Sequence, residues 1–118
     1  MLSFFGDLVM KATYQNGHNR WRKTLGAMPI AWDTTLAGQA ASVARTCDDR
    51  QKSSKVNMNT ELDVYAQAVY AAHAMNDVWF KDRNNVAGSA RMGRFGCNMQ
   101  KCQTGSQIGY FTVCKYAP

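Results

Sequence analysis

The stretch FGCNMQKCQTGSQIGYFTVCKYAP, from Phe95 to Pro118, decides how this chain folds. It spaces three of the four cysteines as C-x4-C-x11-C, while the fourth, Cys47, lies far upstream. A structural zinc site usually brings its thiolates as close pairs on one tight turn, and the sequence contains no C-x2-C pair. An even number of cysteines in a small chain therefore indicates a disulfide-stapled fold made in an oxidising compartment.

Length and composition indicate a single domain over residues 1–118. Hydrophobic residues make up 46% of the chain, which argues against disorder. The formal net charge is +6, but the basic residues are spread along the chain, which favours a solvated basic surface over a nucleic-acid site. No apolar run approaches the roughly 20 residues of a membrane helix. The opening MLSFFGDLVM lacks the basic region of a signal peptide, so a secreted form is expected to have lost its signal before this sequence begins.

Apolar residues at helical spacing predict three helices before the cysteine-rich stretch. The first is expected over residues 4–22, with Phe5, Leu8, Val9 and Ala12 on its apolar face. Asp33 can cap the second helix. That helix carries the apolar residues Leu36, Ala37, Ala40, Val43, Ala44 and Cys47.

Residues 48–59 are polar and predict a loop, after which Thr60 is expected to begin the third helix. Apolar residues cover so much of its girth that burial on more than one side is expected. These residues are Leu62, Tyr65, Ala66, Val69, Ala72, Met75 and Trp79.

Two segments near the C-terminus, residues 92–98 and 108–116, have strand character, and the second alternates residues that favour strands. Helices therefore come first and strands last. This order predicts an α+β domain with a small antiparallel sheet.

Several motifs in order resemble one known family. HNRWR, from His18 to Arg22, is followed by MPIAWDTTLAGQAASVARTC, from Met28 to Cys47. The C-terminal FGC, KC and FTVCKYAP segments complete the pattern. Together they resemble CAP domains, the family of the cysteine-rich secretory proteins, insect venom allergens and plant pathogenesis-related proteins. The resemblance covers both ends of the chain and thins out between Asp48 and Met92.

The resemblance implies an α-β-α sandwich with a three-stranded antiparallel sheet between helical layers. It also implies which cysteines pair. Carried over to this chain, the family's pattern joins Cys47 to Cys102 and Cys97 to Cys114.

Many CAP domains line a cleft with two histidines and two acidic residues, which bind a divalent metal in some members. Here the stretch after Cys47 reads DDRQKSS, with no histidine, and Asn57 stands where a glutamate is usual. Asp82 is a shorter acid at the second acidic position, and the segment DRNNVAGSARMG lacks the remaining histidine. The sequence therefore predicts no metal and no other cofactor. The resemblance leaves a degenerate cleft of Gln51, Asn57, Asp82 and His18.

Both histidines, His18 and His73, are expected to be structural. A buried or capping contact is favoured over catalysis for His18, and a packed or surface position is expected for His73. If all four cysteines are bridged, no cysteine nucleophile remains, and no serine lies in a G-x-S-x-G elbow. The sequence therefore predicts no enzyme, and a metal-dependent hydrolase is set aside because its donors are missing.

The leading interpretation is a secreted, extracellular protein that binds a small apolar ligand, a sterol or a fatty acid, as several CAP families do. Its role would lie in host interaction, venom action or defence. Aromatic residues and seven methionines could line an apolar groove, although most aromatic side chains in a domain of this size form the core. The alternative is a protein-interaction effector whose basic surface engages a host receptor, a channel or an anionic membrane. Nucleic acid is not an expected partner.

Overall fold

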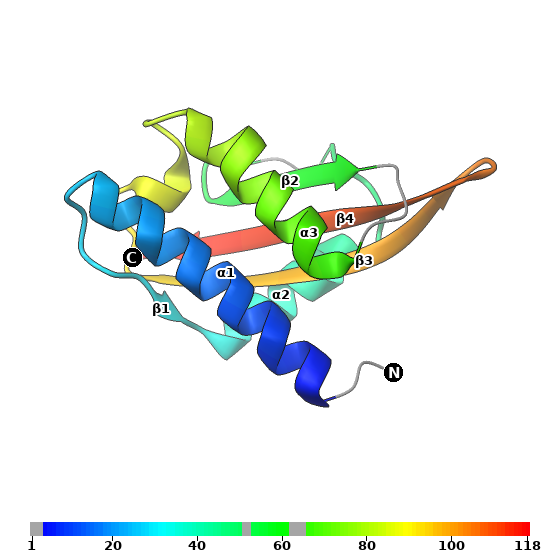
Figure 1. Cartoon of the computed structure of the whole chain (residues 1–118), viewed down its shortest axis with the longest axis horizontal. Helices are drawn as coiled ribbons and strands as arrows, with labels where there is room; N and C mark the ends of the chain where they lie inside the picture. Colours follow the sequence, from blue (N-terminus) through cyan, green and yellow to red (C-terminus); the bar gives the residue numbers. More distant parts are fainter. Residues whose placement is uncertain (1–3, 51–52, 62–65) are drawn as a thin grey trace.

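The computed structural model describes residues 4–50, 53–61 and 66–118. Helix α1 (Phe4–Thr24) is followed by the short strand β1 (Ala31–Trp32) and helix α2 (Thr34–Ala44) (Figure 1). Strand β2 (Val56–Glu61) precedes helix α3 (Gln67–His73), which continues into a π-helical turn, η1 (Ala74–Val78), and a 3₁₀ turn, η2 (Trp79–Lys81). A further 3₁₀ turn, η3 (Val86–Gly88), leads to the hairpin of β3 (Arg94–Thr104) and β4 (Gln107–Ala117).

The described residues form a four-stranded sheet in the order β1-β3-β4-β2. Strands β2, β3 and β4 are antiparallel, so the expected three-stranded sheet is present, but β1 adds a parallel fourth strand at the edge. The Ala31 amide donates to the Gly93 carbonyl at 3.0 Å, and the Asp33 amide donates to that of Phe95 at 2.7 Å. The loop expected over residues 48–59 is partly wrong, because residues 56–61 pair with the free edge of β4.

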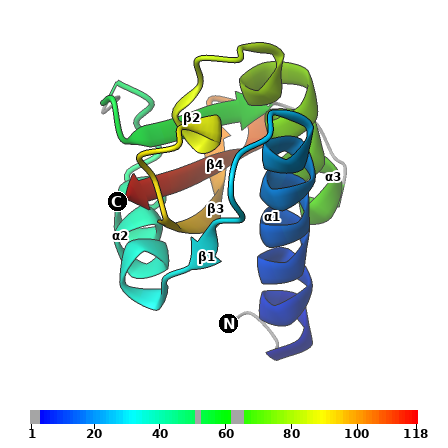
Figure 2. The ribbon, with the colours of Figure 1, turned by 90° about the vertical axis from the view of Figure 1, so that its left-hand side faces the viewer.

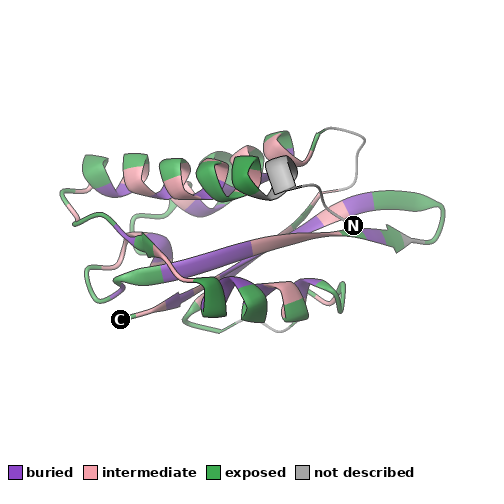
Figure 3. Ribbon diagram, turned by 90° about the horizontal axis from the view of Figure 1, so that it is seen from below, coloured by how far each residue is buried: buried purple, intermediate pink, exposed green. Residues whose placement is uncertain are grey.

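Helices cover both faces of the sheet in three layers. Figures 2 and 3 show α1 and α3 on one face and α2 on the other. Alternate residues of β4 serve the two sides: Cys114 and Tyr116 pack in the cluster under α1 and α3, whereas Phe111 and Val113 pack against α2. Because both faces are covered, β4 is buried along much of its length. Within the described part of the chain, no helix combines the length and apolar character that a membrane span needs.

The buried face of α1 differs from the expected one. Leu8 and Val9 are 46% and 55% exposed, and the Phe5 side chain lies outside the described side chains. Ala12 is exposed as well, and among the α1 side chains that the structure describes the buried ones are Tyr14, His18 and Arg22, at most 1% exposed. His18 and Arg22 are buried in place of the expected aliphatic residues because both form hydrogen bonds with distant segments of the chain.

The third helix also begins later than expected. Thr60 lies in β2, and α3 starts at Gln67, while Leu62 and Tyr65 lie outside the described residues. Val69, one of the apolar residues expected to be buried, is 51% exposed. The inward face of the helix carries Tyr70, Ala71, Ala74 and Met75.

Two disulfides fasten α2 and the hairpin. Cys47, in a left-handed conformation (φ 52°) just beyond α2, joins Cys102 of β3. Cys97 and Cys114 are register partners across β3 and β4, with Cα atoms 4.0 Å apart. These are the pairs that the family resemblance implies. On the chain-entropy argument, the separations of 55 and 17 residues correspond to about 4 and about 3 kcal/mol.

Helix α2 is placed by its cap and by a glycine beneath it. Asp33 caps it as expected, because its Oδ1 accepts the Leu36 amide at 2.9 Å. Its Oδ2 lies 2.7 Å from Arg94 Nη1 of β3. A Cβ on Gly96 would lie 2.6 Å from both the Ala37 Cα and the Asp33 carbonyl oxygen, and closer still to the Ala37 nitrogen. The helix therefore reaches the sheet only because residue 96 has no side chain.

Replacing Gly96 by alanine should lower the free energy of unfolding by at least about 2 kcal/mol, because the backbone of α2 would have to move away from the sheet. Gly38→Ala is the matched control. Gly38 lies in the same helix with open space around its missing Cβ, so this change should raise the free energy of unfolding by up to about 1 kcal/mol. Urea unfolding measures both variants. A Gly96→Ala protein as stable as the parent would contradict this packing.

Candidate functional site

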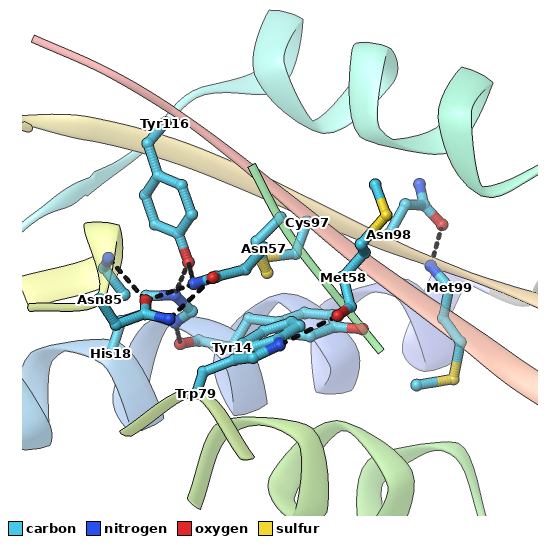
Figure 4. The surroundings of a disulfide bond; sticks show 12 residues. Tyr14, His18, Asn57, Met58, Trp79, Asn85, Cys97, Asn98, Met99 and Tyr116 are labelled. Atoms are coloured by element: carbon cyan, nitrogen blue, oxygen red, sulfur yellow. Dashed lines mark hydrogen bonds between the residues drawn. A yellow bond between two sulfur atoms is a disulfide. The ribbon is translucent and has the colours of Figure 1, made fainter. Parts of the chain in front are cut away.

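A chain of hydrogen bonds runs beneath the surface between α1, β4, β2 and the residues before η3 (Figure 4). His18 Nε2 lies 2.6 Å from the Tyr116 hydroxyl oxygen, and Asn57 Nδ2 lies 3.0 Å from the same oxygen. Asn57 and Asn85 exchange two amide hydrogen bonds of 2.6 and 2.9 Å. We refer to His18, Tyr116, Asn57 and Asn85 as the polar network.

The partners of the network fix where its protons lie. His18 Nδ1 is 2.8 Å from the Tyr14 carbonyl oxygen, which can only accept, so Nδ1 carries the proton. The His18 Nε2 atom must then accept the Tyr116 hydroxyl proton. The Tyr116 oxygen in turn accepts from Asn57, whose second amide proton goes to Asn85. Each of these polar groups therefore has a partner of the correct type.

Burial keeps the network neutral. His18 is fully buried, and loss of hydration lowers its pKa to about 4, while the hydrogen bond to Tyr14 opposes this shift and the Arg22 charge adds to it. Burial also raises the pKa of Tyr116 well above its usual range. At neutral pH, His18 and Tyr116 are thus both uncharged. The network can hold these four segments together but offers neither a charged acid nor a free base.

The Arg22 guanidinium fixes one wall beside the network. Its Nε donates to the Met28 carbonyl at 2.6 Å, and Nη1 donates to the carbonyls of Ala87 and Ser89 at 2.9 and 3.0 Å. Its Nη2 donates to the Met92 carbonyl at 3.2 Å. Arg22 is 1% exposed, and no carboxylate among the described residues pairs with it. The end of α1 therefore holds the segment 87–92 in place through backbone carbonyls.

A cleft of about 660 Å³ lies between that segment, the start of β2 and the C-terminal residue. Asn57 of the network forms part of its lining. No acidic residue lies among the described residues that line it. We call it the polar cleft, after the residues Ser53, Ser54, Lys55, Asn84, Ser89 and Arg91.

The structure brings together two of the four residues expected in the degenerate cleft. Asn57 and His18 meet at the Tyr116 hydroxyl group. Asp82 is exposed, and its Oδ1 accepts the Asn84 amide at 2.9 Å, with no hydrogen bond to the network. Gln51 lies outside the described residues.

These residues do not suit a divalent metal. The amide groups of Asn57 and Asn85 are occupied by each other and by Tyr116. Within the described residues, the one cluster of three potential ligands is His18 with Cys97 and Cys114, and its two sulfurs are joined in a disulfide. A disulfide sulfur is not a thiolate ligand, so this cluster lacks the donors of a zinc site.

A second, more apolar groove of about 520 Å³ lies along the β3 edge, between α1 and the start of α2. The two-residue strand β1 pairs with β3 only at Arg94 and Phe95, which leaves the edge at residues 97–99 to line this groove. Lys11 also lies along it. We call it the apolar groove, after the residues Leu8, Met10, Tyr14, Trp32, Gly38 and Met99.

The sequence did not single out Tyr116, Asn85 or Arg22 as site residues. Tyr116 lies in the FTVCKYAP segment and Arg22 in the HNRWR segment, so these family motifs could have marked both as site residues. Asn85 offered no comparable signal, because its role depends on Asn57, 28 residues earlier.

The profile of the cysteine-rich secretory protein (CAP) family matches residues 15–116. Among solved structures, MpPR-1i is similar with a TM-score of 0.67 and 21% identity, covering 100% of this chain and 91% of that one. The Schistosoma mansoni venom allergen-like protein 4 is similar with a TM-score of 0.61 and 22% identity, and the match covers 92% of this chain and 86% of that one. The structure of NaASP2 with Zn²⁺ is similar with a TM-score of 0.71 and 15% identity, and the match covers 90% of this chain and 77% of that one. No curated protein sequence matches the chain.

Stability should fall with acid in a window set by His18. Its folded pKa of about 4 lies below the ordinary value of 6.5, so the unfolded chain takes up a proton first as the pH falls. The free energy of unfolding should therefore decrease between about pH 6.5 and 4, by on the order of 3 kcal/mol from this residue.

Urea unfolding across this range, in the parent and in His18→Gln, measures that contribution. The variant should be less stable at neutral pH but should lose less stability on acidification. His73→Gln, which removes the other histidine, is the control and should keep the His18 contribution. An acid loss that disappears with His73→Gln and persists with His18→Gln would contradict the assignment.

Proposed function

The chain belongs to the cysteine-rich secretory protein (CAP) family, and from this premise we propose that it is a secreted, non-enzymatic protein that binds a small apolar ligand. A sterol or a fatty acid is the ligand class, and host interaction, venom action or defence is the role. The observation that carries the proposal is the apolar groove between α1, α2 and the edge of β3.

The groove has the size and lining of a small-molecule site. Its volume of about 520 Å³ falls within the range of roughly 300–1,000 Å³ usual for such sites. Leu8 is 46% exposed, and Met10, Trp32 and Met99 are only partly buried, so apolar side chains remain available for a ligand. Covering this surface would stabilise a complex by about 25 cal/mol per Å² of apolar area, less the cost of ordering the ligand.

One charged side chain, Lys11, lies in the apolar groove and could orient a ligand there. The Lys11 ammonium lies 6.0 Å from the centre of the Trp32 ring, and both residues line the groove. A fatty acid with its chain along Met10 and Met99 could place its carboxylate near Lys11. A sterol would present only a hydroxyl group there. This arrangement favours a fatty acid within the proposed class.

The side chains that could serve catalysis are engaged elsewhere. All four cysteines are bridged. His18 is held by Tyr14 and Tyr116. His73 lies between Glu61 and Asp77, at 2.9 and 2.8 Å. Neither histidine is hydrogen-bonded to a serine, threonine or cysteine nucleophile among the described residues, which supports a binding role.

The disulfides support an extracellular location. Bridges such as Cys47–Cys102 and Cys97–Cys114 form and persist in oxidising compartments. Family membership points the same way, because the matched family is described as secretory.

Gly38→Leu tests the groove directly. Gly38 lines the groove and has open space around its missing Cβ, so leucine should fill the groove without disturbing α2. The parent should bind labelled palmitate or cholesterol saturably, with a dissociation constant of about micromolar size. Gly38→Leu should weaken this binding at least about tenfold, since the new side chain occupies the ligand's space. Gly38→Ala should stay within about twofold of the parent, because a methyl group takes up little room.

Salt dependence separates this function from the alternative of a basic surface that engages a receptor, channel or anionic membrane. Binding in an apolar groove should persist at high ionic strength. Saturable binding equal in Gly38→Leu and the parent would contradict the groove. Binding confined to anionic vesicles and lost with salt would favour the basic-surface alternative, and no binding to lipid of any kind would favour a protein partner.

A further inference from the structure

We propose that the polar cleft is a binding site for a phosphate or sulfate group, separate from the apolar groove. The two sites lie in different parts of the molecule. The groove is lined by parts of α1, β1, α2 and β3 with Gln67. The cleft is lined by residues 53–57 and by Asn84, Val86, Ser89, Arg91, Met92 and Pro118.

The cations of the cleft are not neutralised. Lys55 and Arg91 both line it, both are exposed, and neither forms an ion pair with a described residue. Asp82, two residues before the lining residue Asn84, accepts the Asn84 amide and forms no ion pair with Lys55 or Arg91. Pro118 also lines the cleft, and its backbone oxygen accepts from Arg94 Nε at 3.2 Å. Two positive charges on the walls of one hollow concentrate the field there, which favours an anion of more than one charge.

Hydroxyl groups with protons to donate lie beside these charges. The Ser53 oxygen accepts the Lys55 amide at 3.3 Å, and the Ser89 oxygen accepts the Arg91 amide at 3.2 Å. Each hydroxyl proton is left to donate to an oxygen in the cleft. A guanidinium, an ammonium and two hydroxyls together match the several acceptor oxygens of a tetrahedral oxyanion.

The donors stand on walls that are already held in place. Arg22 binds the carbonyls of Ala87, Ser89 and Met92 on one side. On the other side, the Tyr116 amide donates to the Lys55 carbonyl at 3.0 Å. A ligand therefore has mainly two long side chains to order, which keeps the entropic cost of binding low.

The cleft is larger than a single oxyanion. Its volume of about 660 Å³ leaves room for the group that carries the phosphate or sulfate. A free anion, a soluble ester and a lipid headgroup share this chemistry, so the probes below separate them.

The test is titration of the folded protein with inorganic phosphate and with inorganic sulfate, followed by amide NMR shifts. Saturable shifts are expected at residues 53–57 and 84–92. The double variant Lys55→Gln with Arg91→Gln should weaken binding at least about tenfold, since it removes two charge-assisted contacts. Arg20→Gln with Lys101→Gln is the matched control, because it removes the same net charge from exposed positions outside the cleft. This control should stay within about twofold of the parent.

Sedimentation with phosphatidylcholine vesicles, with and without phosphatidic acid, distinguishes a lipid headgroup from a free anion. Vesicle binding that needs both phosphatidic acid and the Lys55–Arg91 pair would place the phosphate on a lipid. Anion binding by the cleft with no such vesicle binding would identify a soluble ligand. Equal weakening in the two double variants, or shifts that never saturate, would overturn the site.

Discussion

The buried guanidinium of Arg22 is the interaction on which the arrangement of the cleft depends. Its positive charge is buried, and no carboxylate among the described residues forms an ion pair with it. The guanidinium instead donates hydrogen bonds to four backbone carbonyl oxygens. Removing it would leave several of those carbonyls unpaired, and each buried unpaired group costs about 1–3 kcal/mol. Because these carbonyls belong to Met28 and to the segment 87–92, one side chain of α1 fixes both the turn toward β1 and a wall of the polar cleft.

The polar network gives that cleft a neutral floor. Asn57 lines the cleft and is tied to Asn85 and Tyr116, and behind them His18 is held without a charge. To bind a metal, His18 or the side-chain amides of Asn57 and Asn85 would have to break the hydrogen bonds that they already form. The walls carry Lys55 and Arg91, so the charge of the site suits an anion rather than a cation. The apolar groove lies along the other edge of the sheet and is independent of this chemistry.

The sequence predicted those elements whose signals are local. Strand-like residues located β4 over most of its length and the first part of β3, and Asp33 marked the start of α2. Strand β2 was missed because its alternate asparagines carry little strand preference, and it forms by pairing with β4.

Two other features that the sequence did not predict also depend on contacts between distant parts of the chain. Strand β1 is too short for any periodic pattern and exists because β3 offers an edge. The buried face of α1 was misassigned because His18 and Arg22 are polar, and their burial is stable only with partners far away in the chain. The family motifs contained these residues but did not reveal what each one bonds.

A neutral, fully hydrogen-bonded network occupies the floor of the polar cleft. Nitrogen-15 NMR of the His18 imidazole tests it most directly. We expect a neutral ring with its proton on Nδ1, unchanged from about pH 8 to about pH 5 and unchanged when zinc is added. An imidazolium or an Nε2–H tautomer at neutral pH, or a zinc-dependent change at Nε2, would contradict it.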